Sequence, residues 1–167
     1  ARFTNARLSE VRADNFDDNN LQIGSPLYWI NSGGIWTNRD EVAKFNSPSG
    51  SSHIFPSSPH RQSTGIFEFR AKRSNNMSGW IGLNFRKTSV DQLSGISLRL
   101  QATTVALYNG GTSLTSVPVT NSGQWNYYRI LVEGNKLTLY IDGVKSLSYN
   151  LPGAAGNYWS FYGTRIN

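Results

Sequence analysis

The chain has 167 residues, the length of one ordinary domain, and a formal net charge of +6. Charged residues make up only 16% of it, while 38% are hydrophobic and none is cysteine. No run of 18 apolar residues occurs, so no membrane-spanning helix is expected. This composition is typical of a β-rich extracellular domain and argues against a helical cytosolic protein.

The absence of cysteine favours a bacterial secreted protein whose stability comes from its core alone. Because the chain starts at Ala1, we expect a mature or excised piece of a larger multidomain protein. No linker or repeat is visible, so residues 1–167 are predicted to form a single domain, expected to be monomeric.

The first third of the chain is rich in turn residues. Residues 1–11 are predicted to be irregular or an edge strand, and residues 14–20 form a polar turn-rich run. Short strands are predicted at 27–30 and 35–37. Residues 47–60 contain three prolines and many serines, which predicts a long loop.

Beyond residue 60, apolar and polar residues alternate with a period of two, which predicts β-strands. The predicted strands are 65–73, 80–87, 95–101, 104–108, 125–133, 136–141, 146–149 and 158–166. The clearest pair flanks Gly134-Asn135, a tight-turn signal, and a second turn at Asp142-Gly143 ends its second strand. Many short strands and no helical period predict an all-β fold, a two-sheet antiparallel β-sandwich.

The alternation also assigns faces to three strands, 65–73, 80–86 and 95–101. The residues predicted to face the core are Phe67, Phe69, Ala71, Ile81, Leu83, Phe85, Ile96, Leu98 and Leu100. If the three strands are neighbours, their outward residues form one polar surface with an aromatic ring on it. The alternative is a set of cross-strand salt pairs, such as Glu68 with Arg86, that only solubilise the sheet.

Aromatic faces stack on sugar rings and arginine forks match carboxylates, so this surface is a candidate binding site. The candidate ligand-binding residues are Glu68, Arg70, Lys72, Trp80, Asn84, Arg86, Arg99 and Trp36. The stretch 66–100 is also basic, with a net charge of +4. It would attract an acidic polysaccharide, or else serve only as a solvated face.

Three segments carry a family resemblance. They are DNFDD at 14–18 followed by Trp29 and GIW at 34–36, GIFEFRAK at 65–72, and the hairpin at 125–143. Together they resemble the concanavalin A-like and laminin-G-like carbohydrate-binding modules of bacteria, including the levan- and fructan-binding type. The resemblance implies a jelly roll and a sugar gripped by acidic, arginine and aromatic side chains. Glu68, Arg70, Arg86 and Trp80 are the nearest equivalents by residue type.

Modules of this kind often hold a structural Ca²⁺. Asp14, Asp17, Asp18 and Asn19 offer the hard oxygen ligands that Ca²⁺ prefers, although such a run is also typical of a plain turn. Zinc is not expected, because His53 and His60 have no cysteine or second cluster to join.

Little in the sequence indicates catalysis, because no strand carries the paired carboxylates of a glycosidase. The predicted function is therefore a non-catalytic carbohydrate-binding module that targets an attached polysaccharide-degrading enzyme to its glycan, an acidic polysaccharide or a fructan. The alternatives are a glycoside hydrolase or polysaccharide lyase on the same fold, and a protein-binding laminin-G-like adhesion domain. Nucleic acid is not an expected partner, because no recognition motif accompanies the basic charge.

Overall fold

Strands make up the regular structure in the part of the chain that the computed structural model describes. That part is residues 29–32, 36–38, 43–45, 50–56, 62–73, 78–89, 94–120 and 123–165, and it contains thirteen strands. The strands are β1 Trp29–Ser32, β2 Trp36–Asn38, β3 Ala43–Phe45, β4 Gly50–Pro56, β5 Gly65–Ala71, β6 Gly79–Lys87, β7 Ile96–Leu100, β8 Thr104–Asn109, β9 Thr112–Pro118, β10 Asn126–Glu133, β11 Lys136–Ile141, β12 Val144–Asn150 and β13 Tyr158–Arg165. Within these ranges no helix has the length and hydropathy that crossing a membrane requires.

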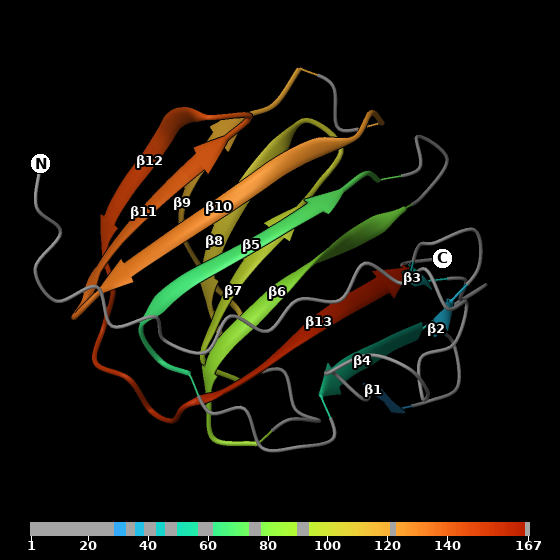
Figure 1. Ribbon diagram of the computed structural model, residues 1–167, viewed down its shortest axis with the longest axis horizontal. Coiled ribbons are helices and arrows are strands. Elements are labelled where there is room, and N and C mark those ends of the chain that lie inside the picture. The colour runs from blue at the N-terminus through green and yellow to red at the C-terminus, as the bar shows by residue number, and fades with distance from the viewer. Residues whose placement is uncertain are drawn as a thin grey trace, which may run out of the picture.

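The strands form two large antiparallel sheets and one small one. The larger sheet has seven strands in the order β1-β4-β13-β6-β7-β8-β9, and the second has four in the order β12-β11-β10-β5. Figure 1 shows the four-stranded sheet in front of β7, β8 and β9. The predicted all-β, two-sheet antiparallel sandwich is therefore confirmed.

The hydrophobic core lies between these two sheets. Leu83 and Phe85 from β6 and Leu98 from β7 meet Tyr128 and Ile130 from β10, and all five are almost completely buried. Each apolar side chain withdrawn from water in this way contributes roughly 1.5–3 kcal/mol to folding. The residues predicted to face the core on the three middle strands all belong to this cluster or pack against it.

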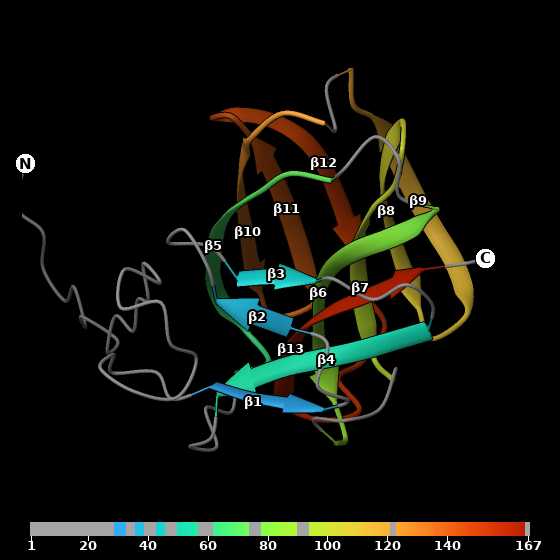
Figure 2. The same cartoon turned by 90° about the vertical axis from the view of Figure 1, so that its right-hand side faces the viewer.

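A small two-stranded sheet, β2 and β3, covers the inner face of the seven-stranded sheet where the four-stranded sheet does not reach (Figure 2). Trp36 and Phe45 pack there at 5.4 Å between ring centres, over Ile54 of β4. Gly163 of β13 permits this approach, because a Cβ at that position would lie 2.5 Å from the Phe45 ring.

The predicted hairpin is also confirmed. Glu133 pairs with Lys136 across the Gly134-Asn135 turn, and Ile141 pairs with Val144 across Asp142-Gly143. Asp142 and Gly143 both have positive φ, at 50° and 81°, as a two-residue hairpin turn of this hand requires.

The sequence pattern did not predict three of the strands, β3, β4 and β9, and the predicted loop at residues 47–60 was wrong. The sequence predicts a loop at residues 47–60, but Gly50–Pro56 within them form β4, which lies between β1 and β13 in the large sheet. The prolines lie outside the part of β4 that pairs with β13, so they do not interrupt that ladder. β3 and β9 were missed because they are short or mostly serine and threonine.

Candidate functional site

The predicted candidate residues do not share one face, because the three strands assumed to be neighbours belong to two different sheets. β5 pairs with β10 in the four-stranded sheet, whereas β6 and β7 pair with each other in the seven-stranded sheet. Glu68, Arg70 and Lys72 therefore point away from the sandwich on one side. Trp80, Asn84 and Arg99 lie on the opposite side, on the outer face of the seven-stranded sheet. The expectation of one continuous polar surface was wrong.

Arg86 also departs from the predicted alternation. Its φ is +56°, and the pairing of β6 with β13 shifts register next to it, so β6 bulges at this point. The bulge places Lys87, not Arg86, beside Asn84 on the outer face, where Lys87 Nζ lies 2.9 Å from Ser160 Oγ. Arg86 instead turns toward the four-stranded sheet and donates to the carbonyl of Gly134 and to Asn135 Oδ1.

Trp36 is separated from the other candidates as well. It lies in the small sheet, on the core side of β4, and its indole Nε1 donates to the carbonyl of Ser52 at 3.3 Å. Its ring is buried against Ile54 and Phe45, on the opposite face of the seven-stranded sheet from Trp80.

The basic stretch 66–100 does not form a surface patch either. Four of its cations, Arg73, Arg86, Lys87 and Arg99, are buried, and only Arg70 and Lys72 among the described ones are exposed. Arg73, for example, donates to the carbonyl of Gly79 at 3.2 Å, and burial lowers the pKa of its guanidinium.

A row of stacked side chains crosses the outer face of the seven-stranded sheet. It consists of His53 on β4, Tyr162 on β13, Trp80 on β6, Arg99 on β7 and Tyr108 on β8. The His53 and Tyr162 ring centres are 4.4 Å apart, and those of Tyr162 and Trp80 are 4.6 Å apart. The Arg99 guanidinium carbon lies 4.4 Å from the Trp80 ring centre and 3.8 Å from that of Tyr108. We call these five residues the stacked row.

Arg99 is held in the row by neutral partners. Its Nε donates to Ser97 Oγ at 3.0 Å and its Nη2 to the carbonyl of Gly110 at 2.8 Å. Burial lowers the pKa of the guanidinium, while the charges of Tyr108 and Tyr162 act in the opposite sense. Only 9% of the residue remains exposed.

Asn84 lies beside the row with an unsatisfied amide. The side chain is fully buried, and neither Oδ1 nor Nδ2 has a hydrogen-bond partner among the described residues. Its cross-strand neighbours are Ser97 on β7 and Ser160 on β13. Ser160 is already engaged, because its Oγ lies 3.0 Å from His53 Nδ1 and accepts from Lys87. A buried amide without a partner costs roughly 1–3 kcal/mol, so a water molecule or ligand atom is expected there.

The outer face of the four-stranded sheet has a different character. Trp125 and Tyr127 are exposed there at 40% and 37%. Lys72 Nζ lies 5.2 Å from the Trp125 ring centre, and Glu68 pairs with Arg129 at 3.3 Å. A hydrogen bond to Glu68 raises the pKa of the Tyr127 hydroxyl. Glu68 thus pairs with Arg129, its register partner on β10, rather than with Arg86.

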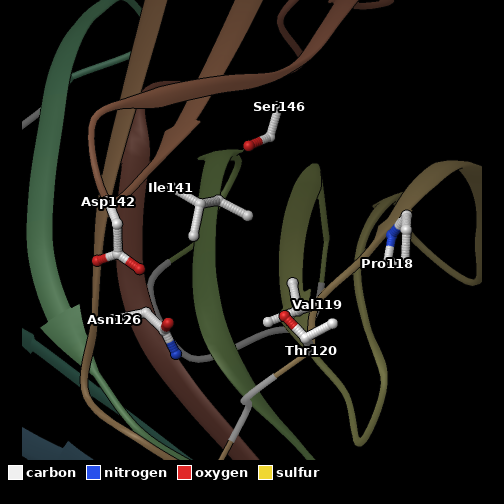
Figure 3. A pocket seen from close by; sticks show the side chains of 7 residues that line it. All are labelled: Pro118, Val119, Thr120, Asn126, Ile141, Asp142 and Ser146. Atoms are coloured by element: carbon white, nitrogen blue, oxygen red, sulfur yellow. The ribbon is translucent and has the colours of Figure 1, made fainter.

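A cavity of about 260 Å³ opens at one end of the sandwich (Figure 3). Asn126, Ile141 and Asp142 lie on one side of it, and Pro118 to Thr120 on the other. Asp142 Oδ1 accepts from the backbone N–H of Tyr127 at 2.8 Å. The cavity contains no residue of the stacked row and none of the predicted ligand-binding residues.

The proposed calcium ligands Asp14, Asp17, Asp18 and Asn19 lie outside the described residues. Within the described part of the chain, no three histidine or acidic side chains come together in a way that could hold a metal ion.

Sequence reasoning identified Trp80, Asn84 and Arg99 but missed three members of the row. Tyr108 and Tyr162 alternate with the core residues Leu107 and Phe161, so the period-two pattern that assigned the middle strands would have placed them outward. His53 carried no such signal, because it stood in a stretch assigned to a loop.

No protein-family model and no curated protein sequence matches the chain. Its fold, however, is shared with solved structures of low sequence identity. One is the carbohydrate-binding module CBM66 from Bacillus subtilis, with a TM-score of 0.68, 18% identity and coverage of 82% of this chain and 88% of that one. Another is the Crh5 transglycosylase in complex with NAG, with a TM-score of 0.65, 15% identity and coverage of 92% and 66%.

A third is the exoplasmic/lumenal domain of VIP36 in its Ca²⁺/Man-bound form, with a TM-score of 0.62, 11% identity and coverage of 83% and 76%. A carbohydrate-binding module, a Ca²⁺/Man-bound domain and a transglycosylase thus share one architecture, so the likeness shows the fold and does not show the function. The chain has the concanavalin A-like jelly-roll fold, as its sequence motifs predicted.

Proposed function

We propose that this protein binds carbohydrate without cleaving it, and that the sugar lies on the outer face of the seven-stranded sheet. The observation that carries the proposal is the stacked row, in which five side chains from five different strands touch in sequence. Four members of the row are buried, and the partly buried one, Tyr108, offers a ring to the apolar C–H surface of a sugar. Arg99 beside it offers a fixed donor to the sugar hydroxyls.

The row is most accessible at its β7–β8 end. Tyr108 and Gln101 are only partly buried, and they lie 3.5 Å apart between the Tyr108 hydroxyl and Gln101 Nε2. Thr104 Oγ1 donates to Gln101 Oε1 at 2.8 Å, which fixes the orientation of that amide. A sugar entering here meets a ring and a prearranged amide, and so pays little entropy to order them.

The non-catalytic part of the proposal is supported by where the described carboxylates lie. Glu68, Glu133 and Asp142 all belong to the four-stranded sheet or its turns, and none of these three reaches the stacked row. A glycosidase needs two carboxyl groups flanking the bond that breaks. Incubation with a glycan that binds should therefore release no reducing ends or unsaturated products above a buffer control.

In this proposal the domain is a monomeric module of a larger secreted bacterial protein and holds an attached polysaccharide-degrading enzyme near its substrate. Tethering raises the local concentration of catalytic sites without any change in those sites. Ultracentrifugation of the isolated domain should give a monomer. Fusing the domain to an unrelated hydrolase should increase cleavage of an insoluble glycan that the domain binds, and leave cleavage of a short soluble substrate unchanged.

Calcium remains part of the proposal. A structural Ca²⁺ held by Asp14, Asp17, Asp18 and Asn19 would stabilise the fold, since a ligand that binds only the folded state does so by mass action. Excess chelator should then lower the melting temperature, and Ca²⁺ should restore it. An unchanged melting curve would contradict the proposed calcium site and would not bear on the proposed sugar site.

The site itself is tested by a matched pair of tyrosine variants. Tyr108→Ala removes the partly buried ring at the accessible end of the stacked row, and Tyr127→Ala removes an exposed ring from the other sheet. Calorimetric titration against a panel of neutral and acidic oligosaccharides should show about tenfold weaker binding for Tyr108→Ala. Tyr127→Ala should bind like the parent. The reverse pattern would indicate that the sugar binds the four-stranded sheet instead. A parent protein that binds no glycan would contradict the proposed carbohydrate-binding function.

A further inference from the structure

We infer that the stacked row recognises the carboxylate of an acidic sugar, a uronic acid residue, and that Arg99 is the group that binds it. This rests on the proposed carbohydrate-binding function and narrows its ligand class from glycans in general to acidic ones.

The first step is the charge of Arg99. A guanidinium stays protonated at any physiological pH, and buried charges in proteins are normally paired with an opposite charge. Arg99 is buried, yet its hydrogen bonds go only to the hydroxyl of Ser97 and the carbonyl of Gly110. The structure gives Arg99 no ion pair with any described carboxylate. The site thus carries a positive charge whose counter-charge the described part of the protein does not supply.

The second step is the fixed position of this charge. β6 and β8 flank β7, so Trp80 and Tyr108 approach Arg99 from the two neighbouring strands. Ser97 and Gly110 hold Nε and Nη2, while Nη1 has no bond to the described residues. A guanidinium held in this way has already lost its side-chain freedom, so it binds a planar carboxylate at little further entropic cost.

The third step is the neighbouring amide. Asn84 pairs with Ser97, the residue that Arg99 bonds, and its buried Nδ2 and Oδ1 are both unsatisfied. Gly82, the register partner of both Tyr162 and Arg99, carries no side chain, and the Trp80 ring stacks against both of those residues. A ligand group that reached both Arg99 and Asn84 would accept from Arg99 and from Asn84 Nδ2 while donating a hydroxyl to Asn84 Oδ1. A uronic acid has both a carboxylate and ring hydroxyls, and so meets both requirements.

A neutral sugar meets only one of them. Its hydroxyls would satisfy Asn84 but would leave the Arg99 charge uncompensated in a partly dehydrated site. A charge-assisted bond to carboxylate is stronger than a bond to a neutral oxygen, and the guanidinium fork matches carboxylate geometry. Recognition of the acid over its neutral form is therefore expected to come from Arg99.

The test compares uronate oligosaccharides with their methyl esters, which keep the sugar and remove only the charge. A panel of oligogalacturonate, oligoglucuronate and oligomannuronate is titrated into the parent protein by calorimetry. At least one uronate should bind, and its methyl ester should bind at least tenfold more weakly. Binding of the acid should also weaken as salt is raised, because salt screens the exposed charges of the approaching oligouronate over ~8 Å at physiological ionic strength.

Three variants locate the effect. Arg99→Gln should lose at least tenfold in affinity for the acid and should no longer distinguish acid from ester. Arg70→Gln removes the same charge from the exposed face of the other sheet and should bind like the parent. Asn84→Asp places a carboxylate opposite Ser97, the residue that Arg99 bonds, so it should raise the melting temperature and abolish binding of the acid. This gain in stability distinguishes a lost site from a lost fold.

The outcomes separate this inference from the proposed function. Equal affinity for acid and ester, or binding of neutral fructans or glucans alone, overturns the acidic ligand and leaves carbohydrate binding intact. Tighter binding of dextran sulfate than of any uronate contradicts specific recognition of a carboxylate group. If the parent binds no glycan of any class, both fail together.

Discussion

Arg86 and Asn135 connect the two sheets of the sandwich, with 3.1 Å between Arg86 Nη1 and Asn135 Oδ1. The same guanidinium also donates to three backbone carbonyls, those of Ser63, Gly134 and Pro152. Arg86 is almost fully buried, and burial lowers the pKa of its guanidinium. One side chain of the seven-stranded sheet thus supplies donors to the β10–β11 turn and to two loops.

Replacing Arg86 should therefore destabilise the fold rather than remove a ligand contact. Arg86→Ala leaves several buried carbonyls without donors, at roughly 1–3 kcal/mol for each group that water cannot reach. We expect the free energy of unfolding in urea to fall by about 3 kcal/mol, and Arg86→Lys to recover part of it. Arg70→Ala, an exposed arginine, should change it by less than about 0.5 kcal/mol. Glycan affinity of folded Arg86→Lys should match the parent; a large loss of affinity without a loss of stability would contradict this assignment.

The raised pKa of the buried Tyr128 hydroxyl should make the fold less stable in alkali. Burial raises the pKa of its hydroxyl to about 12, with the charge of Asp142 adding to the shift and a hydrogen bond from Asn126 opposing it. In the unfolded chain the tyrosine has its ordinary pKa near 10. A raised folded-state pKa means that the full stabilisation is present below about pH 10 and is lost as the pH rises toward 12. The loss can reach roughly 2–3 kcal/mol.

Urea unfolding between pH 9 and 12, followed by fluorescence, measures this loss. Tyr128→Phe keeps the buried ring and has no proton to lose, so its stability should decline less over that range. Identical pH profiles for the parent and Tyr128→Phe would assign the alkaline loss to other groups.

Much of the fold followed from the sequence because the period of two is a local signal. Leu137 and Leu139 alternate with polar residues whatever sheet they belong to, and both are buried in the core as expected. Which strands lie side by side is not local information. β5 and β6 follow one another in the chain, yet β5 pairs with β10 and β6 with β7 and β13, so residues assigned to one face were divided between two.

Two other features of the site were hidden for different physical reasons. The bulge at Arg86 reverses the alternation at a single residue, and arginine carries no propensity that marks a positive φ. β4 reads as a loop because serines and prolines surround it, but β1 and β13 on either side supply the hydrogen bonds that hold it extended. His53 could be assigned to the stacked row only once this pairing was known.

Gly163 should not tolerate a side chain. A Cβ at this position would lie 2.5–2.7 Å from three atoms of the Phe45 ring, so the ring must move for Ala to fit. Overpacking of this kind costs about 1–3 kcal/mol, and here it would displace the small β2–β3 sheet from β13. Gly163→Ala should lower the melting temperature, and Gly163→Ala with Phe45→Leu should recover part of the loss. Gly153→Ala, where a Cβ meets nothing within 4 Å, is the control.

The pair formed by Glu68 and Arg129 should contribute little to stability. Both side chains are about half exposed, with 3.3 Å between Glu68 Oε1 and Arg129 Nε, and exposed pairs contribute about 0–1 kcal/mol. A double-mutant cycle of Glu68→Gln with Arg129→Gln should give a coupling energy in that range, smaller still in high salt.

The same carboxylate has a clearer effect on Tyr127. A hydrogen bond to Glu68 raises the pKa of the Tyr127 hydroxyl, chiefly because ionisation would break that bond and place two negative charges together. Glu68→Gln should therefore lower the pKa of Tyr127 toward its ordinary value, and Arg129→Gln should raise it, because the positive charge of Arg129 favours the ionised form. NMR titration of the Tyr127 ring, with Tyr127→Phe to assign its signals, measures both shifts. Opposite signs in the two variants would confirm that the four-stranded face is a local network of charges, and equal signs would contradict it.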